Sequence, residues 1–289
     1  MVSTVSLVRD NNVTEALSKA LELIGDLKRF VNRKKVLIKV NLTVARSAET
    51  GSTCDPRVLG FLIDDCYAKG AREVSVGDGS AVSMEDVLKA NPIDNVAKNH
   101  KAEFIDLNRG SFRVVEVKNG LAVNGYALSE YVLNAEVLIN LAKMKTHTMA
   151  GVTLCMKNLM GCILGGGSWD GKNYHWKDYS DRRKIHTTGC NRALVDLNTL
   201  IHPNLNIIDG FIAQEGDSPF KGEPVDMKTF IAGEDIVAVD AIGAKVMGFN
   251  PTSIGYIKIA AERGLGDLNP RVVGDEISQV VRRFKSNIK

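Results

Sequence analysis

Three basic side chains alternate along one short stretch of the chain, at Lys143, Lys145 and His147. They follow the apolar run 137–141, whose composition is typical of a buried strand. If the backbone stays extended beyond this run, all three side chains project to the same side. Two ammonium groups and an imidazole on one side repel one another unless an anion lies between them, and their crowding lowers the pKa values of the lysines. The stretch therefore predicts a pocket for a carboxylate, a phosphate or an acidic partner, with a solvated basic loop as the alternative.

Lys157 and Asn158 form a second pair of candidate site residues. The segment 151–161 is expected to form a short helix that ends at a glycine. Lys157 either serves the pocket or complements the negative end of this helix, and Asn158 either contacts a ligand or forms part of the cap. A lysine with a lowered pKa can act as a general base or as a Schiff-base nucleophile, and histidine commonly transfers protons. We therefore predict catalytic roles for Lys145, His147 and Lys157.

A glycine-rich segment, Gly165–Gly167, leads into a polar stretch that contains His175, Arg182 and His186. Three consecutive glycines favour either a lid over the pocket or a merely exposed loop. His147, His175 and His186 could together hold a divalent metal, although their spacing matches no local metal motif.

No cofactor can be named from the sequence. It contains neither a GxxxxGK[ST] phosphate loop nor a strand–GxGxxG–helix fingerprint for dinucleotides. The cysteines, at positions 54, 66, 155, 162 and 190, include no CxxC pair, so neither a zinc ribbon nor a ferredoxin-type iron–sulfur cluster is encoded. The cofactor is left unknown, with a divalent metal as an open alternative.

The elements that must position these residues alternate between strands and helices. Strands are predicted over 4–8, 35–42, 73–78, 137–141, 205–209 and 228–232, and helices over 13–27, 55–70, 193–201, 235–247, 252–263 and 276–284. Two strands with an intervening helix within residues 35–78 form a βαβ unit, whose strands are parallel. Short strands over 104–107, 113–117 and 126–128 would add a small antiparallel insertion. We predict an α/β fold, a mainly parallel twisted sheet flanked by helices.

Several polar residues end or follow predicted strands, where open parallel sheets bind their ligands. Asn41, Asp78, Asp209 and the segment after Leu141 share this position and are expected to lie together. Asp240 lies among small apolar residues, so its carboxylate is expected either to reach water or to be buried in a functional role. That role would be to pair with a lysine or to hold a metal together with Asp209. The turn-rich segment 215–224 is a candidate for the rim of the pocket.

Length, composition and charge narrow the class of protein. A chain of 289 residues can form one α/β domain over 1–289, or two lobes that meet near residues 100–150. Its 37 basic and 34 acidic side chains leave a charge of +3, too small to require a nucleic-acid partner. The N-terminus does not resemble a signal peptide, and no apolar run approaches the roughly 20 residues that cross a bilayer. With scattered cysteines, this predicts a cytoplasmic protein without a membrane partner.

Taken together, these motifs resemble the family numbered 362 among the domains of unknown function. The resemblance covers nearly the whole chain and is carried by residues 37–42, 70–78, 143–147, 152–161, 186–197, 208–216 and 237–240. It implies that the family pattern includes Lys39, Asn41, Asp78, Lys145, His147, Lys157, Asn158, His186, Asp209 and Asp240. From the resemblance and the strand-end positions, we predict substrate-binding roles for Lys39, Asn41, Lys143, Asn158 and His186. Asp78, Asp209 and Asp240 are predicted to support them.

Members of this family are often joined to a ferredoxin-like iron–sulfur module. This chain lacks the cysteines of such a module, so the resemblance implies that a ferredoxin-like partner would be a separate protein. The chain also resembles nickel-dependent lactate racemases more faintly, in its succession of strand, polar turn, helix and strand. A similarity of layout does not transfer an activity.

Two functions are compatible with these features. The first is an enzyme in which Lys143 and Lys145 hold the carboxylate or phosphate of a small substrate while His147 or Lys157 moves a proton. The carboxylates would orient a lysine or a divalent metal. The alternative is a non-catalytic partner of a redox or iron–sulfur system that docks through a basic patch. Nucleic-acid binding is disfavoured by 6% aromatic residues, little net charge and no recognisable module.

Overall fold

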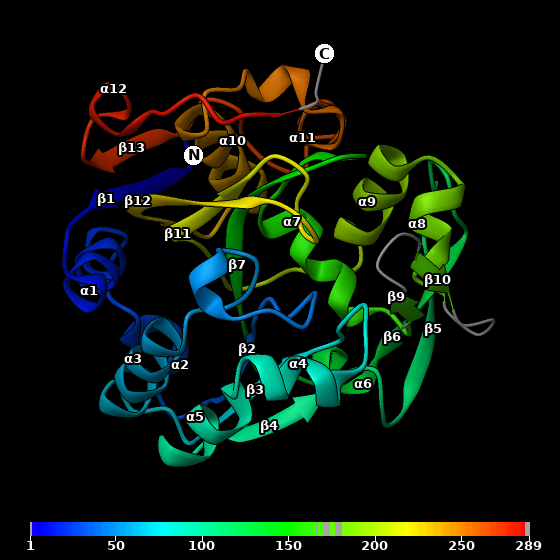
Figure 1. The fold of residues 1–289 in the computed structure, drawn as a ribbon, viewed down its shortest axis with the longest axis horizontal. Helices are drawn as coiled ribbons and strands as arrows, with labels where there is room; N and C mark the ends of the chain where they lie inside the picture. The colour runs from blue at the N-terminus through cyan, green and yellow to red at the C-terminus, as the bar shows by residue number, and fades with distance from the viewer. Residues whose placement is uncertain (1, 166, 170–173, 177–180, 287–289) are drawn as a thin grey trace.

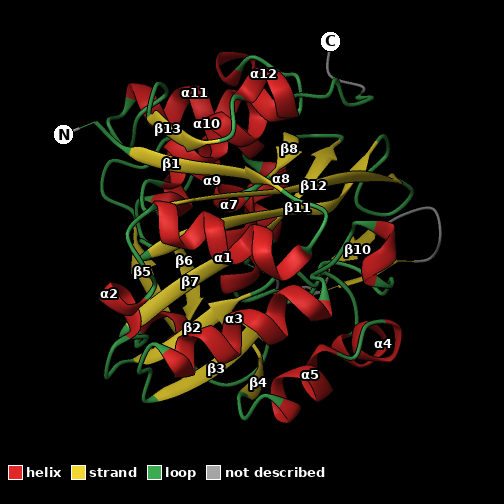
Figure 2. Ribbon diagram, turned by 90° about the vertical axis from the view of Figure 1, so that its left-hand side faces the viewer, coloured by secondary structure: helices red, strands yellow, loops and turns green. Residues whose placement is uncertain are grey.

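A nine-stranded sheet forms the centre of the computed structural model, which describes residues 2–165, 167–169, 174–176 and 181–286. The strand order is β13-β1-β12-β11-β7-β2-β3-β4, with β8 paired to the end of β7. The strands are β1 (Thr4–Arg9), β2 (Lys35–Lys39), β3 (Glu73–Asp78), β4 (Glu103–Asp106), β7 (Val137–His147), β8 (Gly151–Thr153), β11 (Leu205–Glu215), β12 (Glu223–Gly233) and β13 (Arg271–Gly274). Figure 2 shows this order from β1 at the top to β4 at the bottom. Among these nine strands only β8 and β12 run against the rest, so the sheet is mainly parallel, as predicted.

Helices cover both faces of this sheet. One face carries α1 (Val13–Leu23), α2 (Lys28–Val31), α3 (Pro56–Ala68), α4 (Met84–Ala90) and α5 (Ile93–Asn99). The other carries α7 (Cys155–Asn158), α9 (Cys190–Asn198), α10 (Ile236–Val246), α11 (Gly255–Glu262) and α12 (Ile277–Val280). In Figure 1, α1 and α3 lie on one side of β7 and α9 lies on the other. The predicted α/β class is confirmed.

The remaining elements are short. β5 (Phe112–Glu116) and β6 (Gly125–Ser129) form an antiparallel pair, which confirms two strands of the predicted insertion. The third, predicted over 104–107, is instead β4, which pairs in parallel with β3 in the main sheet. β9 (Gly167–Trp169) and β10 (Tyr174–Trp176) form a second pair, which the sequence pattern does not predict. The others are α6 (Glu130–Leu133), α8 (Arg183–Thr187) and the 3-10 turns Ala48–Thr50, Leu159–Cys162 and Pro251–Ser253.

Alternation along the strands separates two apolar cores. In β2, Val36 and Ile38 belong to the core beneath α1 and α3, whereas Leu37 belongs to the core beneath α9 and α10. In β7, Leu141 and Met144 are divided between the two cores in the same way. Successive side chains of a strand point to opposite faces, so one sheet supports both helical layers.

The starts and ends of the helices follow local chemistry. Asp55 caps α3 and Pro56 occupies its first position, as the sequence predicts. Gly70 follows this helix with φ +93°, a conformation that costs glycine little. At α1 the cap is Asn12, whose side chain accepts two backbone N–H groups of the first turn.

Two segments differ from the sequence prediction. β7 continues through His147, because β8 pairs with its last three residues. The helix predicted over 151–161 is wrong in its first half, since Gly151–Thr153 form β8 and helical turns begin only at Cys155. Gly151 has φ +86°, which lets the chain reverse direction after β7 and return along it. The helix predicted over 276–284 is likewise reduced to the four residues of α12.

The five cysteines are free thiols, and four of them are buried. Burial raises the pKa of Cys54, Cys66, Cys155 and Cys162, so these thiols stay protonated and pack as small apolar groups. In the described part of the chain, no helix is both long and apolar enough to cross a bilayer.

The cap of α10 provides a test of this framework. Asp235 accepts the backbone N–H groups of Val237 and Ala238, and its other oxygen accepts from Ser3 and Asp267. We expect Asp235→Ala to lower the free energy of unfolding by about 1–2 kcal/mol, the usual effect of losing a cap. Urea unfolding measures the change. The control is Glu262→Ala, which removes an exposed partner of Lys258 and should cost less than about 0.5 kcal/mol. Equal losses in the two variants would contradict the assigned role of the cap.

Candidate functional site

A cavity of about 460 Å³ lies at the carboxyl ends of β2, β3 and β7. Its wall contains the candidate residues Asn41, Asp78, Lys145, His147, Lys157, Asn158 and His186, together with Gly161, Arg182 and the segment 217–221. This is the edge at which open parallel sheets bind ligands, and the volume suits a small molecule. The structure therefore brings together Asn41, Asp78 and the end of β7, three of the groups that the sequence places at strand ends.

Lys145 reaches the cavity from β7 and is 1% exposed. Its Nζ donates to Asn41 Oδ1 at 2.8 Å and to the Ser52 carbonyl oxygen at 2.6 Å. Burial, with the nearby ammonium groups of Lys157 and Lys143, lowers the pKa of Lys145 well below its usual value. Lys145 is thus firmly positioned by two neutral acceptors.

Lys157 reaches the same cavity from α7 and is 7% exposed. Its Nζ lies 3.2 Å from the thioether sulfur of Met160, which is a weak acceptor. No carboxylate among the described residues lies within 4 Å of this Nζ. Burial lowers the pKa of Lys157, and the charge of Arg182 contributes in the same direction. Both effects disfavour the charged form of Lys157 relative to a lysine in water.

His147 ends β7 and is oriented by the backbone that follows it. Its Nδ1 accepts the backbone N–H groups of Met149 at 3.1 Å and Ala150 at 3.2 Å. An Nδ1 that accepts cannot carry the proton of the neutral ring, so Nε2 carries it and is available as a donor. Burial lowers the pKa of His147 well below its usual value, and the charge of Lys157 lowers it further. His147 is therefore a neutral hydrogen-bond donor.

His186 and Arg182 reach the cavity from α8 and the residue before it. Burial lowers the pKa of His186 to about 3, with further effects from Lys157 and Arg182. Arg182 is 3% exposed and donates to the carbonyl oxygens of Gly79, Ser80 and Ile163. Arg182 is the main site residue that the sequence analysis left without a role. Its position in a run of basic residues gave no sign of burial.

Asp78 is the buried carboxylate of the cavity wall, and Lys39 holds it. Lys39 Nζ lies 2.7 Å from Asp78 Oδ1, and Asp78 Oδ2 accepts the backbone N–H of Leu42. A Cβ at Gly161 would lie 2.0 Å from Asp78 Oδ1 and 2.7 Å from Lys39 Cε. Only glycine allows the backbone to approach this ion pair so closely. Lys39 acts on the cavity through Asp78 and does not itself line it.

Buried asparagines join neighbouring strands behind the cavity. Asn158 Oδ1 accepts from Asn41 Nδ2 at 2.8 Å, and Asn158 Nδ2 donates to Asn140 Oδ1 at 2.8 Å. Asn140 donates in turn to Asn206 Oδ1 at 3.0 Å. Because each amide has both a donor and an acceptor, the chain of bonds fixes the orientation of Asn41, the residue that holds Lys145.

Besides Lys39, three candidate residues do not line the cavity. Lys143 Nζ lies 2.8 Å from Asp209 Oδ2, and both side chains are fully buried. Asp240 lies on α10 and accepts the backbone N–H groups of Cys155 and Met156 at the start of α7. Burial raises the pKa of Asp240 to about 7. None of the three lines the cavity, so the expected cluster of Lys143, Lys145 and His147 is divided between two environments.

No group of three potential metal ligands occurs among the described residues. Of the proposed histidine triad, His147 and His186 line the cavity, and the side chain of His175 lies outside the described residues. A metal-binding histidine usually donates its second ring N–H to a partner, whereas Nδ1 of His147 accepts hydrogen bonds. The expected lid, Gly165–Gly167, includes Gly166, which lies outside the described residues. The segment 217–221 does form part of the rim, as predicted.

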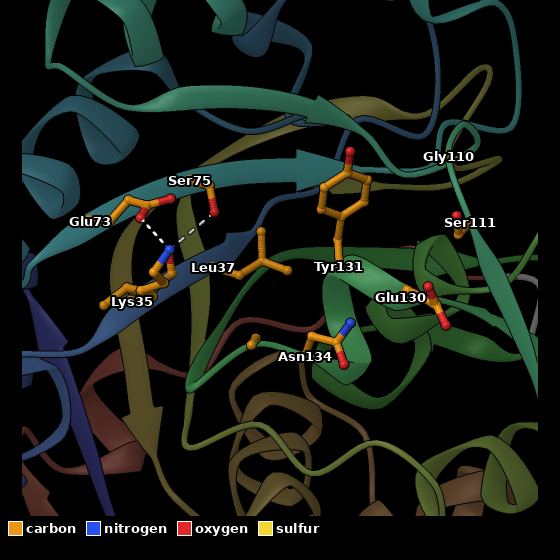
Figure 3. A pocket seen from close by; sticks show the side chains of 11 residues that line it. Lys35, Leu37, Glu73, Ser75, Gly110, Ser111, Glu130, Tyr131 and Asn134 are labelled. Carbon is orange, nitrogen blue, oxygen red and sulfur yellow. Dashed lines mark hydrogen bonds and ion pairs between the residues drawn. The ribbon is translucent and has the colours of Figure 1, made fainter.

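A second cavity, of about 370 Å³, lies at the opposite edge of the sheet, where β2 and β3 begin. Figure 3 shows Lys35 joined to Glu73 in its wall, with the ring of Tyr131 nearby. The Lys35 and Glu73 side chains are half exposed and lie 2.8 Å apart. This ion pair is in contact with water and is worth little, so the cavity is the weaker candidate for a functional site.

The fold and the first cavity define an α/β protein whose candidate site lies at the carboxyl ends of parallel strands. The family model described as Domain of unknown function (DUF362) matches residues 36–245. The chain belongs to this family. Every candidate residue, from Lys39 to Asp240, lies within the matched range.

Two similar proteins extend this comparison. A thylakoid-associated protein of Synechocystis sp. is 27% identical over 278 residues, which cover 93% of this chain and 81% of that protein. The lactate racemase apoprotein of Thermoanaerobacterium thermosaccharolyticum aligns with a TM-score of 0.49 and 11% identity. The alignment covers 83% of this chain and only 57% of the racemase chain. No activity is transferred from either protein.

The titration of His186 tests the electrostatics of the cavity. We expect a pKa of about 3 in the folded protein, measured from the ring signals by NMR. Lys157→Met removes a neighbouring cation and should raise this pKa. The control is Lys184→Met, which removes an exposed lysine paired with Asp181 and should leave the pKa unchanged. A pKa that responds equally to both variants would contradict the placement of Lys157 beside His186.

The same residue makes stability depend on pH. In the unfolded chain the pKa of histidine is about 6.5, above its folded value. Between these two pKa values the unfolded chain binds more protons at His186, so stability falls as the pH decreases from about 6.5 toward 3. Replacing His186 with Gln should reduce the slope of unfolding free energy against pH in this window, measured by urea unfolding. An unchanged slope would contradict the burial of a neutral ring.

Proposed function

We propose that this protein is an enzyme that binds a small anionic substrate, a carboxylate or a phosphate, in the cavity at the carboxyl ends of β2, β3 and β7. One observation carries the proposal. Two buried lysines, Lys145 and Lys157, line the cavity beside Arg182, while its buried carboxylate, Asp78, is already paired with Lys39. Within the described residues, Lys145 and Lys157 therefore have no carboxylate partner in the cavity wall.

Burying a charged side chain is energetically costly. Removing an ammonium group from water costs several kcal/mol unless a counter-ion and hydrogen bonds replace its hydration. Lys39 and Lys143 each have a buried carboxylate within 2.8 Å. Lys145 has only neutral acceptors, and Lys157 has a thioether. An anionic group between Lys145 and Lys157 would restore to them the counter-charge that the protein provides for the other two.

The neighbouring side chains support recognition and proton transfer. His147 has an Nε2–H available to an oxygen of the ligand, because its Nδ1 already accepts backbone bonds. The lowered pKa values of Lys145 and Lys157 bring these amines closer to the range in which a lysine can act as a general base. In this proposal Lys39, Asp78, Asn41 and Asn158 position the lysines.

The alternative function, docking of a ferredoxin-like partner, would use cations on an accessible surface. Lys145 and Lys157 are 1% and 7% exposed, which favours a small ligand as the source of the anion. The docking hypothesis remains a prediction that salt-dependent association would test. The cytoplasm remains the proposed location, because the cysteines are free thiols.

Binding of simple oxyanions tests the proposal. We expect inorganic phosphate or acetate to shift the NMR signals of the His147 and His186 rings and to raise the pKa of His186, since the anion offsets neighbouring positive charge. Lys145→Ala and Lys157→Ala should each weaken binding about 10- to 100-fold, the effect of losing one hydrogen bond to a charged group.

The control is Lys89→Ala, which removes an exposed lysine paired with Glu85 within α4. It should bind phosphate as the parent does. If both site variants also bind phosphate and acetate as tightly as the parent, or if neither anion binds the parent, the proposed function is wrong.

A further inference from the structure

We propose that Lys157 is a nucleophile that forms an imine with its substrate, which makes the substrate a small aldehyde or ketone that carries a carboxylate or a phosphate. This inference rests on the proposed anion site and names its substrate class. It starts from a difference among the buried lysines at this edge of the sheet.

The contacts of the four buried lysines in the described chain are not equivalent. Lys39 and Lys143 are committed to Asp78 and Asp209 by ion pairs of 2.7 and 2.8 Å. Lys145 donates to two oxygen atoms, which fix its position. Lys157 alone among these four has no oxygen acceptor, and its Nζ contacts only Met160 Sδ.

This environment preserves the nucleophilic form of the amine. An ammonium group at this position would have three N–H donors and one weak acceptor, an arrangement that burial makes costly. A neutral amine needs fewer acceptors and keeps a lone pair. The amine lines the cavity, so a bound molecule can reach it. A buried lysine near other cations has the properties of known Schiff-base nucleophiles.

The reaction balances without a further reactant. The lone pair of Lys157 Nζ attacks the carbonyl carbon, and a C–N bond forms while the carbonyl π bond breaks. The carbonyl oxygen then leaves as water with the two hydrogens of the amine, and a C=N bond remains. No electron donor or acceptor is needed.

The remaining groups of the cavity account for the anionic part of the substrate. Lys145 supplies positive charge for a carboxylate or phosphate. His147 supplies an N–H donor for an oxygen of the substrate. A carbonyl compound without an anionic group would lack these contacts and would bind poorly.

Reductive trapping of the whole protein tests the inference. The protein is incubated with pyruvate, dihydroxyacetone phosphate or acetone, and sodium borohydride then converts any imine into a stable secondary amine. Intact mass and peptide mapping locate the adduct. We expect one adduct, on Lys157, with pyruvate or with the phosphate ester, and about tenfold less or none with acetone, which cannot use the charged contacts. The more reactive of the two anionic probes identifies the anionic group.

A charge-preserving variant provides the sharpest comparison. Lys157→Arg keeps a cation and should retain phosphate binding, but it cannot form an imine and should lose the adduct. Lys89→Ala should give the parent yield. If neither anionic probe labels Lys157, if labelling is spread over exposed lysines, or if Lys157→Arg is labelled as well as the parent, the inference is wrong. Peptide mapping of the parent protein decides the question even if the variant does not fold.

The two proposals fail in different ways. Phosphate binding without an adduct on Lys157 would overturn the imine and leave the anion site standing. Absence of phosphate and acetate binding would overturn the anion site itself.

Discussion

Burial of positive charge at the carboxyl edge of the sheet is the constraint on which the rest of the site depends. Four lysine side chains are buried there, and water no longer stabilises their charge. Each must pair with a carboxylate, donate hydrogen bonds to neutral acceptors or lose its proton. Lys39 and Lys143 have carboxylate partners, Lys145 has an amide and a backbone carbonyl, and Lys157 has a thioether. Lys39 and Lys143 therefore act as positioning groups, whereas Lys145 and Lys157 face the cavity.

The surrounding structure serves this arrangement. Gly161 allows the backbone to approach the Lys39–Asp78 pair, and the amide chain from Asn41 to Asn206 locks the strands that carry the lysines. Asp240 holds the start of α7, the helix that carries Lys157, by accepting two of its backbone N–H groups. Residues that do not touch the cavity therefore determine where its amines lie.

Much of the fold could be predicted from the sequence because it rests on local patterns. Alternating apolar residues identify β2 and β3, a continuous apolar run identifies the start of β7, and an Asp followed by Pro marks the start of α3. The segment 151–161 could not be assigned in this way. Its first residues form a strand because they pair with the end of β7. The local sequence pattern, which favours a helix, does not contain this pairing.

For the candidate site, the sequence determined which side chains follow the strands and that their basic groups alternate on one side of β7. That much is a property of strand geometry. Only the tertiary structure decided which of these groups are available. Asp209, from the neighbouring strand, takes Lys143 out of the cavity, while α7 brings Lys157 into it and α8 brings His186. Arg182 completes the wall through contacts with Gly79 and Ile163, residues far from it in the chain. The charge balance of a buried site depends on partners brought together by folding, so no single stretch of sequence contains it.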